Sequence, residues 1–150
     1  MSNNILQNPA FWSVICAILI AQFIKPFIAL FMGEKWNFKL AFSNGGMPSS
    51  HTAAAAAMTI SFGLERGFGS DIFVLSLALL LIVMNDAINV RLETGKHSVL
   101  LNEWSELLSA MNKGFTIQNF KTMVGHTTHQ VFWGMILGLC IGAIITLGFF

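Results

Sequence analysis

The sequence predicts an all-α integral membrane protein, a four-helix bundle with an additional interfacial amphipathic helix between spans three and four. Composition decides the class, since 55% of the 150 residues are hydrophobic, 10% are charged and the mean hydropathy is +0.69. Four apolar runs approach the roughly 20 residues that a helix needs to cross a bilayer. Because so many residues are hydrophobic, membrane lipids are the expected surroundings. The net charge of +1 gives no indication of a nucleic-acid partner.

We expect one membrane domain over residues 1–150. The expected spans cover about 10–32, 49–64, 72–90 and 127–150. The first contains Lys25 beside Pro26, and a cation in such a run must reach the interface or line a polar cavity. The second is short for a span, and its alanines at 53–57 favour close packing inside a bundle.

The fourth expected span carries Gly134, Gly138 and Gly142 at four-residue spacing, which predicts a packing stripe. Between the third and fourth spans, residues 97–113 place apolar side chains at helical spacing opposite charged ones. We expect this segment to lie in the membrane interface and to end at Gly114.

The distribution of basic residues orients the chain in the membrane. Seven of the eight Lys and Arg residues, all but Arg66, lie toward the side of loops 33–47 and 91–130. The positive-inside rule makes that side cytoplasmic and places both termini on the other side. We therefore expect a multi-pass protein of a bacterial inner membrane or an organellar membrane, with its site on the cytoplasmic face.

A glycine-led turn, Gly45-Gly46-Met47-Pro48-Ser49-Ser50-His51, opens onto the alanine run. The glycines allow positive φ, the proline presets the first helical φ, and the serines can cap the helix that follows. A helix start of this kind favours an anion, and a histidine in its first turn can transfer a proton. The alternative is a well-capped helix start with no ligand.

The predicted topology brings the ionisable side chains to one depth on the cytoplasmic side, where four helices can surround a polar pocket. They are Lys25, His51, Asp86, Arg91, His97, His126 and His129. Arginine and lysine suit a phosphate group, and neutral histidine can attack phosphorus or protonate a leaving oxygen near pH 7.

These residues resemble the divergent family related to type 2 phosphatidic acid phosphatases, which is akin to acid phosphatases and vanadium haloperoxidases. The Gly-Gly-Met-Pro-Ser-Ser-His string is the specific part of the likeness. The supporting matches, in chain order, are Ala21-Gln22-Phe23-Ile24-Lys25-Pro26, Asp86-Ala87, Val90-Arg91, Gly95, Leu101-Asn102 and Gly125-His126. The resemblance covers nearly the whole chain.

The resemblance implies a lipid phosphate phosphatase, a phosphomonoesterase or pyrophosphatase that acts on a phospholipid or isoprenoid phosphate through a phosphohistidine. It implies that Lys25, Ser49, Ser50 and Arg91 bind phosphate. The catalytic set that we expect is His126 as nucleophile, His51 as acid, Gln130 and Asp86. Neither a metal nor another cofactor is implied.

The nucleophile has two candidates. His126 matches the family's Gly-His, but four residues later the chain has Gln130 where the family carries a carboxylate, which Glu93 could supply if the loop folds back. His97 is the rival, because it follows Arg91 at the spacing of the parent motif, although Leu101 stands where that motif has Asp.

Two further alternatives remain at this stage. Because Gln130 is neutral, the chain could be a catalytically impaired protein that binds or helps to transport lipid phosphates. A metal site built from His126, His129 and Asp86 is also conceivable, since residues three apart on a helix can chelate. The sequence does not determine the substrate head group or the oligomeric state.

Overall fold

The structure, a computed structural model, describes residues 4–43, 45–111, 116–117, 119–120 and 126–148, apart from the side chain of Leu92. The described residues form helices and turns, with no strand among them. The elements in order are η1 (Ile5–Gln7), α1 (Pro9–Phe31), η2 (Phe38–Phe42), α2 (Ser50–Arg66), α3 (Asp71–Asn85), η3 (Asp86–Val90), α4 (Arg91–Met111) and α5 (Thr128–Gly148). The all-helical prediction is confirmed.

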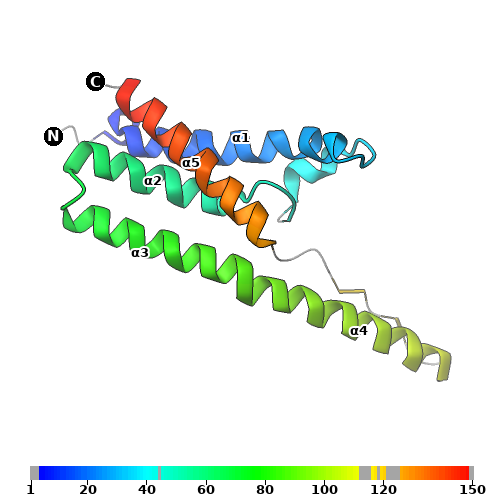
Figure 1. The fold of residues 1–150 in the computed structure, drawn as a ribbon. Coiled ribbons are helices and arrows are strands. Elements are labelled where there is room, and N and C mark those ends of the chain that lie inside the picture. Colours follow the sequence, from blue (N-terminus) through cyan, green and yellow to red (C-terminus); the bar gives the residue numbers. More distant parts are fainter. Residues whose placement is uncertain (1–3, 44, 112–115, 118, 121–125, 149–150) are drawn as a thin grey trace.

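Helix α2 is the centre of the arrangement. It packs against α1, α3 and α5, and α1 also packs against α5 (Figure 1). The beginning of α1 and the end of α5 lie at the end of the molecule where α2 turns into α3 (Figure 1). The connector from α1 to α2 and the beginning of α5 lie away from that end (Figure 1).

Three of the described helical segments are long and apolar enough to cross a membrane, namely Pro9–Phe31, the continuous segment Asp71–Met111 and Thr128–Gly148. Helix α2 has 17 residues and buries much of its surface against the other three. A short helix surrounded in this way fits the expectation from its alanine run. Its small side chains let the neighbouring backbones approach closely.

The closest approach joins α5 to α2. A Cβ added at Gly134 would lie 2.5 Å from the carbonyl oxygen of Ser49, and one at Gly138 would overlap that of Ala53. At Gly142 the added atom would lie 2.6 Å from the Ala57 oxygen. Both rows repeat every four residues, so they run side by side along the two helices, and the predicted packing stripe is confirmed.

Buried hydroxyl groups join the helices further from the α1–α2 connector. The Oγ of Ser61 on α2 donates to Ser13 Oγ on α1 at 2.9 Å and accepts from Thr146 Oγ1 on α5 at 2.8 Å. All three side chains are buried. Hydrogen bonds of this kind satisfy polar groups that have no access to water, and therefore help to fix how the helices meet.

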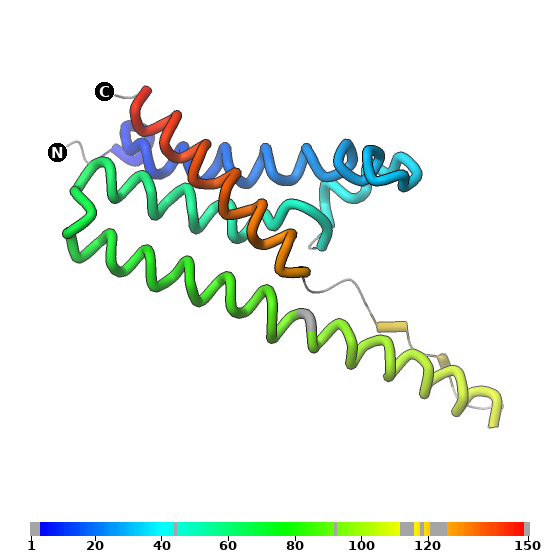
Figure 2. Tube along the Cα trace, viewed as in Figure 1, coloured from blue at the N-terminus to red at the C-terminus, as the bar shows by residue number. Residues whose placement is uncertain are grey.

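Helices α3 and α4 form one continuous helical segment, interrupted only by the π-helical turn η3 (Figure 2). The amphipathic helix expected from about residue 97 begins instead at Arg91, because no proline breaks the helix after α3. Its expected end at Gly114 lies outside the described residues, as do residues 112–113 of that segment and residues 149–150 of the fourth expected span.

The close packing of α5 on α2 predicts the effect of adding one methyl group. We expect Gly138→Ala to lower stability by about 1–3 kcal/mol, the usual cost of overpacking, because its Cβ would meet backbone rather than a flexible side chain. Thermal unfolding in detergent measures the change. Gly148→Ala is the matched control, since its added Cβ meets nothing within 4 Å. Equal melting temperatures for the two variants would contradict the packing account.

Candidate functional site

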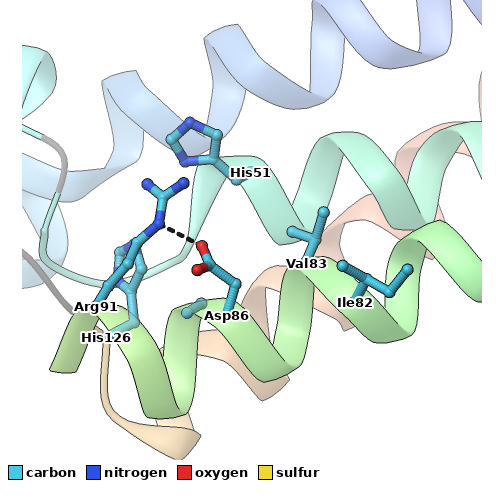
Figure 3. Close-up of a pocket in the computed structure, with 7 residues that line it drawn as sticks. His51, Ile82, Val83, Asp86, Arg91 and His126 are labelled. Atoms are coloured by element: carbon cyan, nitrogen blue, oxygen red, sulfur yellow. Dashed lines mark hydrogen bonds and ion pairs between the residues drawn. The ribbon is translucent and has the colours of Figure 1, made fainter. Parts of the chain in front are cut away.

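One pocket of about 170 Å³ lies where α2, the α3–α4 segment and the start of α5 meet. Its lining residues are His51, Ile82, Val83, Asp86, Ala87, Arg91 and His126. Four of these are ionisable and come from three separate parts of the chain, and their side chains surround a common space in Figure 3. The structure therefore brings His51, Asp86, Arg91 and His126 together.

The pocket lies at the N-terminus of α2. Ser49 is the N-cap of this helix, and its Oγ accepts hydrogen bonds from the backbone N–H and the hydroxyl of Thr52. Gly46 has a φ of +86°, which glycine adopts readily. Pro48 differs from expectation: it precedes the cap instead of occupying the first helical position, so it does not preset the φ of a helical residue.

Ser49 and Ser50 are both buried. The Ser49 hydroxyl caps the helix, and the Ser49 amide donates to the carbonyl of Gln130 at 3.0 Å. The backbone amides of Ser50 and His51 have no acceptor among the described residues. Free amides at a helix start are donors to which an anion can bind.

Lys25 is one of the most buried side chains, with 2% of its surface exposed. Its Nζ donates to the carbonyl of Ser43 at 2.9 Å, and its Cδ lies close to Gly46, so the connector before α2 folds over it. In the described part of the chain the ion pairs are those of Arg91 and Lys96, and neither involves Lys25. A buried ammonium without a carboxylate partner favours an anionic ligand nearby.

Arg91 and Asp86 face each other across the π-helical turn. The Nε of Arg91 donates to Asp86 Oδ2 at 2.5 Å. The Arg91 backbone N–H donates to the Asp86 carbonyl, five residues back, where an α-helix would use that of Ala87. The Ala87 carbonyl instead accepts the backbone N–H of His126 at 3.2 Å.

His126 is held by backbone and side-chain bonds together. Gln130 Oε1 accepts the Thr127 backbone N–H at 3.1 Å and lies 3.2 Å from Nδ1 of His126. A backbone N–H can only donate, so the Gln130 atom facing both groups is the amide oxygen, and Nδ1 must carry the proton. This tautomer leaves an unprotonated lone pair on Nε2 of His126.

Burial lowers the pKa of His126, because the side chain is only 3% exposed and the charged form is poorly solvated there. The hydrogen bond to Gln130 opposes this shift by favouring the imidazolium. The positive charges of Lys25 and Arg91, together with His51, lower the pKa further. Neutral imidazole is therefore the form that this environment stabilises.

Other candidate residues lie elsewhere. His97 and His129 are exposed and do not line the pocket. Glu93 pairs with Lys96 on the exposed surface of α4, at 2.6 Å, and so does not replace the missing carboxylate beside His126. Within the described ranges, no group of three His, Cys, Asp or Glu side chains could hold a metal ion, so His126, His129 and Asp86 do not form the metal site considered above.

Sequence reasoning missed three backbone groups that shape the site: the carbonyls of Ser43 and Ala87 and the amide of Thr127. It also missed the apolar wall formed by Ile82 and Val83. Backbone partners leave no signal in residue types. The π-turn likewise has no local composition that distinguishes it from an α-helix.

The lowered pKa of His126 predicts how its ring titrates. In NMR spectra of the protein in micelles, we expect the imidazole to titrate below its ordinary pKa of about 6.5. Between the two values the unfolded chain binds more protons, so the stability that His126 supplies is present above about pH 6.5 and is lost as the pH falls. His126→Gln assigns the signal. A titration above the ordinary value would contradict this account.

The chain is similar to known proteins along most of its length. The family model described as the divergent PAP2 family matches residues 6–141. The protein named uncharacterized membrane protein YuiD, from Bacillus subtilis (strain 168), is 31% identical over 153 residues, covering 95% of this chain and 96% of the relative. No solved structure matches the chain. The resemblance expected from the glycine-led turn is confirmed: this membrane protein belongs to the divergent PAP2 family.

Proposed function

We propose that this protein is a membrane phosphatase that cleaves a lipid phosphate through a phosphohistidine on His126. The observation that carries the proposal is the tautomer and orientation of the His126 imidazole ring. Its Nδ1–H faces Gln130 and its Nε2 is left unprotonated, in a pocket that it shares with His51 and Arg91. A neutral, oriented imidazole beside a cation and a second histidine is suited to attack on phosphorus.

The phosphate group binds to two kinds of donor in this scheme. Arg91 and the buried ammonium of Lys25 supply positive charge. The amides of Ser50 and His51, which have no acceptor among the described residues, supply donors at the start of α2. Ser49 contributes by capping that helix. The charges of Lys25 and Arg91 both act on His126, which supports placing them around one ligand.

The reaction then proceeds in two balanced steps. His126 Nε2 forms a bond to phosphorus while the bond to the leaving oxygen breaks, and His51 gives that oxygen its proton. In the second step His51 takes a proton from water as the water oxygen bonds to phosphorus and the nitrogen–phosphorus bond breaks. Inorganic phosphate leaves, and His51 is again protonated.

A lipid substrate is supported by the composition of the pocket wall. Ile82 and Val83 line it beside the ionisable groups, and Ile82 is 64% exposed on the outside of α3. We propose that α1, α2, α3 and α5 all cross the membrane, that α4 contributes an interfacial surface, and that the pocket faces the cytoplasm. An apolar tail could then remain among membrane lipids while the phosphate enters the pocket.

A binding or transport-related function is the second candidate, and Gln130 is the observation that favours it. A neutral amide fixes the His126 ring but cannot stabilise the imidazolium by charge. Loss of the equivalent carboxylate charge in serine proteases costs about four decades in rate. A protein with this site could therefore hold a lipid phosphate without turning it over.

The first functional prediction concerns phosphate release. Purified protein in micelles should release phosphate from a short-chain phosphatidic acid or isoprenyl diphosphate, and His126→Ala should abolish this activity because the nucleophile is lost. A colorimetric phosphate assay with and without chelator measures both. Wild-type activity that survives chelation supports histidine chemistry.

His97→Ala is the matched control, because His97 is exposed and lies outside the pocket. It should retain activity. Loss in His97→Ala with full activity in His126→Ala would reverse the assignment of the nucleophile. If inorganic phosphate binds but no lipid phosphate is cleaved, the binding function replaces the enzymatic one.

The second functional prediction tests the departure from the family at Gln130. Gln130→Glu should raise kcat by at least about tenfold, part of the roughly 10⁴-fold effect of a carboxylate in the comparable role. The new carboxylate also raises the pKa of His126, so the acid limb of the kcat profile should move to higher pH. Gln130→Met removes the acceptor and should lower kcat. An unchanged rate and pH profile in Gln130→Glu would separate this side chain from catalysis.

A further inference from the structure

We infer that Asp86 is a positioning residue that grips one edge of Arg91 and leaves its two terminal nitrogens free for phosphate. This inference rests on the proposed function, in which Arg91 binds the phosphate group. It assigns Asp86 neither proton transfer nor contact with the substrate. The inference is carried by the register of the π-turn and by the way in which the two side chains meet.

The π-turn sets the register. In an α-helix, residues five apart are separated by roughly 140° around the axis and lie on different faces. In η3 the backbone N–H of Arg91 donates to the carbonyl of Asp86 five residues back, which stacks the two residues. The pair is therefore a product of the extra residue in this turn. Single π-turns within α-helices often occur at functional sites.

The contact uses a particular part of the guanidinium. Arg91 presents five N–H donors, of which the Nε–H goes to Asp86. In Figure 3 the two terminal nitrogens point away from Asp86 and toward His51 across the pocket. These nitrogens form the fork that suits two oxygens of a phosphate group.

The same turn also holds the proposed nucleophile. Because the Arg91 N–H goes to Asp86, it does not occupy the carbonyl of Ala87, and this carbonyl accepts the N–H of His126. Two consecutive residues of η3 therefore position Arg91 and His126, the two side chains that act on the same phosphate group in the proposed reaction. Asp86 sets the direction of the Arg91 fork, and Ala87 sets the backbone of His126.

The wild-type protein offers a direct test. The chain has only two arginines, Arg66 and Arg91, so spectra of protein labelled with ¹⁵N-arginine contain two Nε–H signals, and Arg66→Lys assigns them. We expect the Arg91 Nε–H to exchange slowly without ligand and to keep its bond when inorganic phosphate is added. The terminal nitrogens of Arg91 should respond to phosphate. Rapid exchange of this Nε–H in the ligand-free protein would overturn the inference.

Two neutral variants separate the hydrogen bond from the charge. Asp86→Asn and Asp86→Ala lose the same charge, but only Asn keeps an oxygen that can accept from Nε. Vanadate should bind about tenfold more tightly to Asp86→Asn than to Asp86→Ala, as expected for one hydrogen bond to a charged donor. In an Arg91→Lys background the difference should disappear, because lysine has no Nε edge.

The outcomes distinguish this inference from the proposed function. Equal vanadate affinity in the two Asp86 variants, or a difference that persists with Arg91→Lys, would overturn the positioning role and leave the phosphatase proposal standing. Slow exchange of the Arg91 Nε–H, without any response of its terminal nitrogens to phosphate, would support the hydrogen bond from Arg91 to Asp86. It would contradict phosphate binding at Arg91. If Asp86→Ala does not fold, the wild-type spectra still decide.

Discussion

The close approach of α5 to α2 holds the described helices and the pocket in place. Three glycines of α5 lie against backbone atoms of Ser49, Ala53 and Ala57, at distances that admit no side chain. This contact lets the Ser49 amide reach the carbonyl of Gln130. The side chain of Gln130 then holds His126, so a packing contact continues directly into the site.

The site combines groups whose charges are balanced in different ways. Arg91 is paired with Asp86, whereas the buried Lys25 donates to the Ser43 carbonyl and has no carboxylate partner among the described residues. His126 is buried and favours its neutral form, because burial and neighbouring positive charge both oppose protonation. Lys25 does not line the pocket, but its charge and that of Arg91 both disfavour the protonated form of His126.

The long α3–α4 segment extends from the packed helices past the pocket. Its apolar first half packs on α2, and its second half carries exposed side chains such as Leu101 and Trp104. The π-turn lies between the halves, where Asp86, Ala87 and Arg91 serve the pocket. The π-turn therefore lies where the packing of α3 on α2 ends, and it places pocket residues at that point.

The helical class, the glycine stripe and the cap at Ser49 could be predicted from the residues, because they depend on residue size, periodicity and local hydrogen bonding. The sequence also singled out His51, Arg91 and His126 as candidates. It took the folded chain to show that Asp86 pairs with Arg91, that Gln130 faces Nδ1 of His126 and that His97 lies away from the pocket. Those contacts depend on helix register and on backbone hydrogen-bond partners, and neither can be predicted from residue types alone.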